Sequence, residues 1–185
     1  MSVRIMTYNV HSCRGMDGRI CHERIADVIE RYDPDVVALQ ELDLGRKRSG
    51  RLDQTRAIAE LVAMDSHFHP ALRIVDEEYG DAILSKYPMK VLRAGALPSP
   101  PRKFIDETRG ALWVSLLVGG QEVQVINTHF GLGRNERRLQ AEALLGDEWL
   151  GAARARGTPV ILCGDFNSPN GGVVHRMFTS QLRDS

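Results

Sequence analysis

The sequence predicts an α/β fold, a four-layer α/β sandwich in which two mixed, mainly antiparallel sheets pack together and are flanked by helices. Two observations support this prediction. Strand and helix patterns alternate over residues 3–64, whereas consecutive strand patterns fill residues 71–128. Strands joined through helices favour parallel pairing and strands joined by short turns favour hairpins, so both kinds of pairing are expected.

The N-terminal part alternates strand and helix. Ile25, Val28 and Ile29 recur at helical spacing, and Asp33-Pro34 ends that helix because a residue before proline avoids the helical region. The expected elements are a strand at 3–8, a helix at 20–32, a strand at 35–40 and a helix at 54–64.

Consecutive strands fill the middle of the chain. They are expected at 71–75, 82–85, 90–94, 111–118 and 122–128, followed by a helix at 137–155, a strand at 159–163 and a helix at 173–182. Gly119-Gly120 separates the fourth and fifth of these strands, and glycine reaches the positive φ angles of a two-residue hairpin. This strand pair is therefore predicted to be antiparallel.

Composition excludes several classes of protein. The 24 basic and 24 acidic residues balance, so no strong field draws the whole molecule to nucleic acid or to an anionic membrane. Three cysteines without a CxxC spacing favour reduced thiols over a disulfide framework or a zinc site. The N-terminus lacks a signal-peptide core and no apolar run is long enough for a bilayer, which predicts a cytoplasmic location.

Polar residues stand where the first two strands are expected to end. Glu41 follows an apolar run, and a carboxylate there is a hard oxygen ligand suited to Mg²⁺ or Mn²⁺. Asn9 ends the first strand and can hold a metal-bound water or the Glu41 carboxylate. Taken singly, a surface glutamate and a turn asparagine are the simpler interpretations.

Two later motifs, Asn-Thr-His-Phe at 127–130 and Cys-Gly-Asp-Phe-Asn at 163–167, also close predicted strands. Asp165 and Asn167 alternate along the chain, so in extended backbone both point to one side. We expect Asp165 to orient an attacking water and Asn167 to donate to a phosphate oxygen.

His129 needs a partner that sets its charge. We expect Asp81, at a strand start two residues after Tyr79, to favour the protonated imidazole, which can then donate to a phosphate or leaving oxygen. Arg109 precedes another strand and is a candidate phosphate contact. A structural histidine is the alternative.

In this order the motifs resemble the endonuclease/exonuclease/phosphatase superfamily of Mg²⁺-dependent, pancreatic-deoxyribonuclease-like phosphoesterases. The resemblance covers almost the whole chain. It implies that Asn9 and Glu41 lie at the metal and that His129, Asp165 and Asn167 are catalytic. It further implies that Tyr79 and Asp81 support catalysis and that Arg109 and Asn127 bind the substrate phosphate.

The resemblance also implies the reaction, a hydrolysis of phosphate esters by in-line attack of an activated water. A phosphodiesterase or nuclease is expected, with Mg²⁺ as cofactor and Mn²⁺ as a substitute. Family members continue to a Ser-Asp-His motif that nothing after Asn167 matches, and His175 has different neighbours. We therefore expect residues 1–185 to form a single domain, incomplete at its C-terminus and weak or inactive. A phosphate- and metal-binding module without turnover is the alternative.

Partners follow from the same residues. Exposed sheet edges in an incomplete domain invite self-association. Basic residues in expected loops either form a rim that holds a polyanion or are solvated surface charges. These residues are Arg46 to Arg51, Arg102-Lys103 and Arg134 to Arg138. The substrate is expected to be a phosphate ester, with nucleic acid as one candidate.

Overall fold

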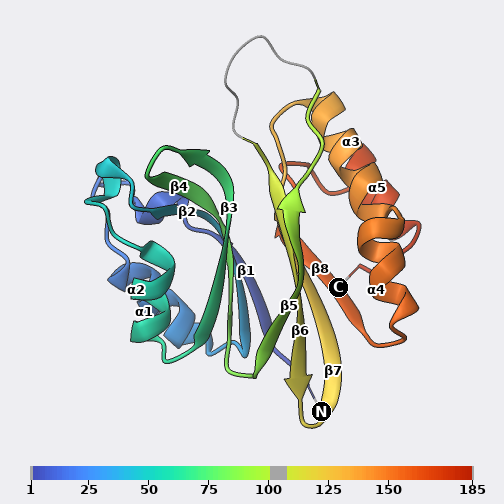
Figure 1. Ribbon diagram of the computed structural model, residues 1–185, viewed down its shortest axis with the longest axis horizontal. Coiled ribbons are helices and arrows are strands. Elements are labelled where there is room, and N and C mark those ends of the chain that lie inside the picture. The colour runs from blue at the N-terminus through green and yellow to red at the C-terminus, as the bar shows by residue number, and fades with distance from the viewer. Residues whose placement is uncertain (1, 101–107, 185) are drawn as a thin grey trace.

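A computed structural model describes residues 2–100 and 108–184 of the chain. In this part of the chain, two four-stranded sheets pack face to face, with helices on both outer faces (Figure 1). This is the four-layer α/β sandwich that the sequence predicts. Among the same residues, no helix is long and apolar enough to cross a membrane.

The first sheet has the strand order β1-β2-β4-β3, with β1 parallel to β2 and the other two pairs antiparallel. Its strands are β1 (Ile5–Asn9), β2 (Val36–Leu44), β3 (Asp65–Ile74) and β4 (Glu77–Ser85). Helices α1 (Glu23–Tyr32) and α2 (Gln54–Leu61) cover its outer face (Figure 1). Asp33 follows α1 in the left-handed region, at a φ of 45°, so the predicted stop at Asp33-Pro34 is confirmed.

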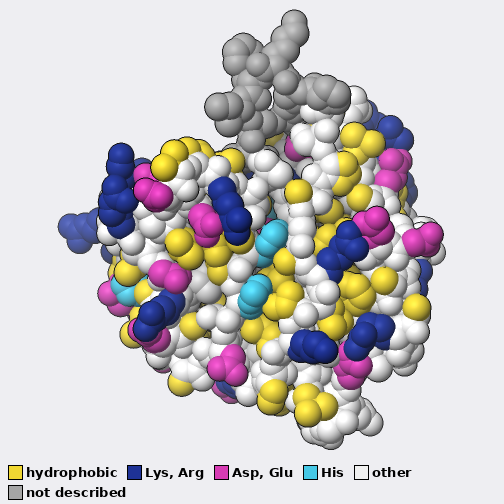
Figure 2. All heavy atoms as spheres, viewed as in Figure 1, with side chains coloured by type: hydrophobic (Ala, Val, Ile, Leu, Met, Phe, Trp, Pro, Cys, Tyr) yellow, Lys and Arg dark blue, Asp and Glu magenta, His cyan; other side chains and the backbone are white. Residues whose placement is uncertain are grey.

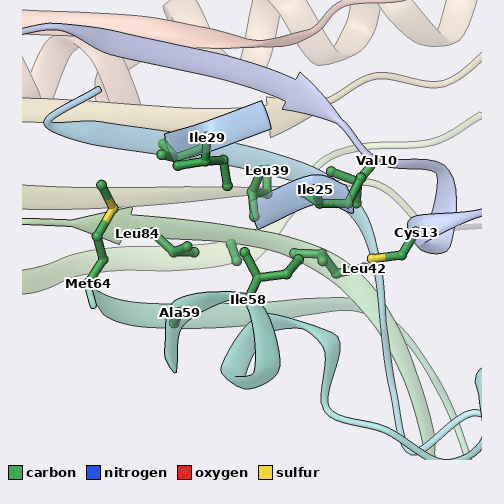
Figure 3. Close-up of a cluster of buried hydrophobic side chains, with 12 residues drawn as sticks. Val10, Cys13, Ile25, Ile29, Leu39, Leu42, Ile58, Ala59, Met64 and Leu84 are labelled. Atoms are coloured by element: carbon green, nitrogen blue, oxygen red, sulfur yellow. The ribbon is translucent and has the colours of Figure 1, made fainter. Parts of the chain in front are cut away.

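An apolar core lies between these helices and the first sheet. Ile25 and Ile29 of α1 and Ile58 of α2 pack toward Leu39 and Leu42 of β2 (Figure 3). All five side chains are buried. Burial of one such side chain contributes roughly 1.5–3 kcal/mol, so this layer fixes both helices on the sheet.

The second sheet has the strand order β5-β6-β7-β8, with the last pair parallel and the others antiparallel. Its strands are β5 (Met89–Ala96), β6 (Gly110–Val118), β7 (Gln121–His129) and β8 (Val160–Asp165). Helices α3 (Arg134–Leu145), α4 (Ala152–Ala155) and α5 (Val173–Thr179) lie on its outer face (Figure 1). Gly119 and Gly120, with φ of 55° and 83°, make the predicted β6–β7 hairpin turn.

Strands β2 and β4 are longer than predicted, and two other elements differ more from the prediction. The helix expected at 137–155 breaks at Gly146, whose extended ψ of 177° ends α3, and a π-helical turn (Asp147–Gly151) precedes α4. Strand β3 begins at Asp65 instead of residue 71, because Pro70 masks its alternating pattern. Pro70 is tolerated there since β3 stands at one end of the strand order.

All three cysteines, each within the described residues, are free thiols as predicted. Cys13 lies in the core of the first sheet. Burial, with the neighbouring charge of Asp43, raises the pKa of the Cys13 thiol to about 12, so this thiol is unreactive.

The two sheets are held together by apolar packing and by one buried amide. Val36 and Ile83 of the first sheet pack with Val114 and Val125 of the second. Among them, Asn127 of β7 crosses the interface and is completely buried.

The Asn127 amide is fully used inside the protein. Its Nδ2 donates to the carbonyl oxygens of Leu39 and Ala82, each at 2.9 Å, and its Oδ1 accepts from Gln40 Nε2 at 2.7 Å. Asn127 therefore links the sheets and has no group left for a ligand. This corrects the expectation that it binds the substrate phosphate.

Strands β1 and β8 stand at the ends of the two strand orders, and within the described residues each pairs on one side only. They also contact each other across the sandwich. Self-association through these edges stays a prediction.

The buried amide gives a test of the fold. Asn127→Ala removes the hydrogen bonds to two buried carbonyl oxygens and the one from Gln40 Nε2, which keeps its bond to the Ala38 carbonyl oxygen. The free energy of unfolding should therefore fall by roughly 3 kcal/mol. Urea denaturation measures it. The matched control is Asn135→Ala, at an exposed position in the first turn of α3, which should change stability by less than about 0.5 kcal/mol. Equal effects of the two substitutions would contradict the role of Asn127.

Candidate active site

The predicted strand-end residues meet at one edge of the sandwich. Parallel pairing brings the ends of β1 and β2 together in one sheet and those of β7 and β8 together in the other. Because β1 contacts β8 across the sandwich, the strand ends of the two sheets lie next to each other. Asn9 comes from β1, Glu41 from β2, His129 from β7 and Asp165 from β8.

Asn9 joins the two halves of the site. Its Nδ2 donates to Glu41 Oε1 at 2.8 Å and to Asp165 Oδ2 at 2.9 Å, while its Oδ1 accepts from the His11 backbone N–H at 3.0 Å. The amide thus holds two carboxylates that would otherwise repel each other. Of the two roles expected for Asn9, holding the Glu41 carboxylate is the one that the geometry displays.

Glu41 does not follow the strand, as expected, but lies inside it at a β-bulge. Strand β2 continues to Leu44, and its register with β4 shifts between Leu39 and Leu42. Glu41 has a φ of 64°, a conformation that a residue other than glycine adopts at a cost. A bulge re-aims a side chain, and here it turns the carboxylate toward Asn9.

The Glu41 side chain is a carboxylate at neutral pH. Burial alone would raise its pKa, but hydrogen bonds from Asn9, His11 and Tyr79 bring the pKa below its usual value. His11 contacts the second oxygen, with Nδ1 3.2 Å from Oε2. His11 follows Asn9 by two residues, a spacing that by itself predicts no role.

His129 is almost fully buried and is neutral. Burial and the neighbouring Arg109 guanidinium lower its pKa to about 4, against the opposite effects of Glu41 and Asp165. Arg109 Nη1 lies 2.9 Å from Nδ1, and a guanidinium only donates, so we assign Nδ1 as the acceptor and place the proton on Nε2. Nε2 lies 3.8 Å from Glu41 Oε1 and 3.9 Å from Asp165 Oδ2.

Asp81 is not the partner that protonates His129, because Arg109 contacts the ring. Asp81 is buried in β4, and burial raises its pKa to about 8, partly opposed by the Arg109 charge and by the Glu41 backbone N–H. Within the described structure, its Oδ2 has no hydrogen-bond partner. Asp81 therefore interacts with the Arg109 charge and with the Glu41 backbone N–H at the bulge, and not with the imidazole.

Asp165 and Asn167 share the site through a turn and not through the expected alternation. Asn167 has a φ of 47°, and its N–H donates to Asp165 Oδ1 at 2.9 Å. Its Nδ2 donates to the Phe130 carbonyl oxygen at 2.8 Å and lies 3.2 Å from His129 Nε2. The prediction that the two side chains gather at one place is confirmed, but its reason was wrong.

The glycine before Asp165 makes this arrangement possible. A Cβ atom at Gly164 would lie 2.0 Å from the Thr128 carbonyl oxygen, and its φ of 142° disfavours other residues. Glycine lets β8 approach β7 closely enough for Asp165 to pair in register with His129.

A second layer of polar contacts supports the site. Arg48 donates from Nε and Nη2 to the completely buried Asp43 carboxylate at 2.8 and 2.7 Å, and from Nη2 to Ser12 Oγ at 2.9 Å. Its guanidinium also lies 5.4 Å from the centre of the Tyr79 ring. The spacing of Asp43, two residues after Glu41, was a visible signal, but nothing separates Arg48 from its basic neighbours in the sequence.

The loop after β1 is strained. His11, Ser12 and Cys13 have φ of 47°, 53° and 58°, and left-handed backbone costs roughly 1–2 kcal/mol per residue. This turn sets His11 against Glu41 and Ser12 against Arg48. Strain that is kept at such a place favours a functional role for the loop.

These side chains line a pocket of about 370 Å³. Its wall includes Glu41, Tyr79, Arg109, His129 and Asn167, so most candidate residues face one space. A larger hollow, of about 610 Å³, lies between β8 and α5 and contains none of these five residues. The smaller pocket is therefore the candidate active site.

Three of the seven described basic residues of the expected rim are ion-paired. Arg46 pairs with Glu77, Arg48 with Asp43 and Arg138 with Glu142, while Arg102-Lys103 lies outside the described residues. On the face shown in Figure 2, basic and acidic side chains are interspersed. A broad polyanion surface is not visible there.

The residues present fit a magnesium ion. Among the described residues, no cluster of three His, Cys, Asp or Glu side chains encloses a metal. Mg²⁺ commonly takes one or two carboxylates and keeps several waters. Glu41 and Asp165, joined by the Asn9 amide, supply such oxygens in one place.

Known proteins share the sequence pattern and the fold of this chain. A model of the Endonuclease/Exonuclease/phosphatase family matches residues 6–185. No curated protein sequence matches the chain. A solved endonuclease/exonuclease/phosphatase from Beutenbergia cavernae is similar with a TM-score of 0.71 and 25% identity, over 91% of this chain and 48% of its own.

Two further structures share the fold. A mannosyl-6-phosphatase from Bacteroides thetaiotaomicron has a TM-score of 0.75 and 20% identity, over 97% of this chain and 71% of its own. The human Nocturnin catalytic domain, with a bound sulfate anion, has a TM-score of 0.72 and 19% identity, over 97% of this chain and 69% of its own. The chain thus spans about half of the Beutenbergia cavernae protein and somewhat over two thirds of the other two.

The second layer of the site can be tested by removing charges singly and together. Arg48→Gln leaves the buried Asp43 carboxylate without its cation, which should cost about 3 kcal/mol of unfolding free energy. Asp43→Asn combined with Arg48→Gln removes both charges and should cost clearly less. Urea denaturation compares the two variants with the unaltered protein; a double variant less stable than Arg48→Gln would contradict this role of the pair.

Proposed function

The chain belongs to the endonuclease/exonuclease/phosphatase family, and on that premise we propose that it hydrolyses phosphate esters with Mg²⁺ as cofactor. The observation that supports this most directly is the Asn9 amide, which holds Glu41 and Asp165 together beside His129. Charge neutralisation, an oriented water and a donor to the phosphate are what the reaction needs. The site offers a candidate for each in Glu41, Asp165 and His129.

Glu41 would hold the cation, as an ionised carboxylate that Asn9, His11 and Tyr79 fix in place. A bound divalent cation supplies charge to the phosphate oxygens and lowers the barrier to attack by water. Asp165 accepts a hydrogen bond from the attacking water and aligns it with the phosphorus. Mn²⁺, which takes similar oxygen ligands, is expected to substitute.

His129 donates from Nε2 to a phosphate oxygen as a neutral imidazole. Arg109 fixes this tautomer through Nδ1 and adds positive charge behind the ring. The Asn167 amide lies beside Nε2 and is placed to contact the same oxygen. Asp81 and Tyr79 are positioning residues, since Asp81 acts through Arg109 and Tyr79 through Glu41.

The reaction we favour is cleavage of a phosphodiester by in-line attack of water, as in a phosphodiesterase or nuclease. A phosphomonoester is the second candidate, since a mannosyl-6-phosphatase shares the fold. The pocket of about 370 Å³ has room for a small ester in either case.

Metal binding is the first test. Glu41→Ala should weaken Mg²⁺ binding at least tenfold in titration calorimetry, because it removes a carboxylate ligand. The control is Glu142→Ala, an exposed carboxylate on α3 that pairs with Arg138. An unchanged affinity in Glu41→Ala would remove this residue from the metal site.

Turnover is the second test. His129→Ala should lower kcat for bis(p-nitrophenyl) phosphate with Mg²⁺ by roughly 100-fold or more, because it removes a donor to the developing charge. His175→Ala is the control, since His175 pairs with Asp184 beside the larger hollow. If both variants kept wild-type rates, the assignment of His129 would be wrong.

A further inference from the structure

We propose that Arg48 and Arg14 form a second anion-binding subsite in the same pocket, so that the preferred substrate carries a second phosphate group. This rests on the proposed function for its first phosphate, which lies at Glu41 and His129. The two arginines line the pocket together with those residues. They come from different loops, and each is held by the fold.

Arg48 is oriented before any ligand arrives. Its bonds to Asp43 and Ser12 fix the plane of the guanidinium, and the Tyr79 ring packs near it. An arginine that served only to neutralise Asp43 could be as buried as that carboxylate, which is completely enclosed. The Arg48 side chain is instead 46% exposed and lies on the pocket wall.

Arg14 is placed by the strained loop after β1. A β-bridge between Arg14 and Ile20 closes this loop directly after the left-handed turn. The Arg14 side chain is exposed, and within the described residues no carboxylate forms an ion pair with it. It therefore brings an uncompensated positive charge to the same wall.

Tyr79 sets the spacing between the two subsites. Its hydroxyl hydrogen-bonds Glu41, while the Arg48 guanidinium lies 5.4 Å from the centre of its ring, so the Tyr79 side chain contacts both Arg48 and the candidate metal ligand. A substrate that reaches both places would carry its two phosphates on separate parts of the molecule. Guanidinium groups match phosphate oxygens in shape and charge, which favours phosphate over a neutral group.

Paired ligands that differ by one phosphate test the subsite without requiring turnover. Titration calorimetry with Mg²⁺ compares thymidine 5′-phosphate with thymidine 3′,5′-bisphosphate, and fructose 6-phosphate with fructose 1,6-bisphosphate. The second phosphate should lower Kd at least tenfold in one pair or both. A gain in one pair alone identifies a nucleotide or a sugar as the source of that phosphate.

Two variants separate the subsite from general attraction of anions. The first variant is Arg14→Gln. The second combines Arg48→Gln with Asp43→Asn, so that no unpaired charge stays in the core. In each variant, the ratio of the monophosphate Kd to the bisphosphate Kd, which we call the bisphosphate advantage, should fall to threefold or less. Affinity for the monophosphates should stay within twofold. Arg56→Gln, which removes an exposed arginine paired with Glu60 on α2, is the charge-matched control and should keep the full advantage. Thermal melting confirms that each variant is folded.

A wild-type advantage below twofold in both pairs, or an advantage that survives in both pocket variants, would overturn the proposal. Failure of the proposed function is distinguishable, because it would appear as absent turnover of bis(p-nitrophenyl) phosphate. A bisphosphate preference that depends on Arg14 and Arg48 would support the subsite whatever the turnover.

Discussion

The alignment of the two sheets is the constraint on which the rest of the molecule depends. The apolar layer between the sheets holds them together but does not fix their relative position, because apolar packing is non-directional. Asn127 fixes this position, since it donates hydrogen bonds to two carbonyl oxygens beside the bulge of β2. A small slip of one sheet on the other would break these bonds and also part Asn9 from Asp165.

The site gathers several features that reduce stability in isolation. Glu41 sits in left-handed backbone, Asp43 is a buried carboxylate, and His129 is held neutral beside a cation. Asn9 holds the Glu41 carboxylate in place, and Arg48 neutralises the charge of Asp43. Departures of this kind from local preference are expected where a protein binds and reacts, and the outer helices show few of them.

The sequence predicted where most site residues lie, but it did not predict all of their contacts. The rule that polar groups at the ends of neighbouring strands converge placed Asn9, His129 and Asp165 correctly, because strand patterns and their ends are local properties. It misassigned Asn127, since a strand pattern does not tell which sheet face its amide meets. It also missed the bulge at Glu41.

The charge of His129 lay beyond the sequence as well. Asp81 was expected to set this charge and Arg109 to contact the phosphate, but which of them contacts the imidazole depends on distances that only the folded chain defines. The fold class was predictable from the order of elements, whereas the helix break at Gly146 and the π-helical turn after it were not.

The bond between Asn9 and Asp165 joins residues 156 positions apart in the chain. No short segment, and neither sheet by itself, contains both carboxylates that this amide holds. During synthesis, the ribosome releases Asn9 and Glu41 long before Asp165, so a partly made chain lacks one of the two carboxylates of the candidate site. This site therefore forms only when the second sheet docks on the first.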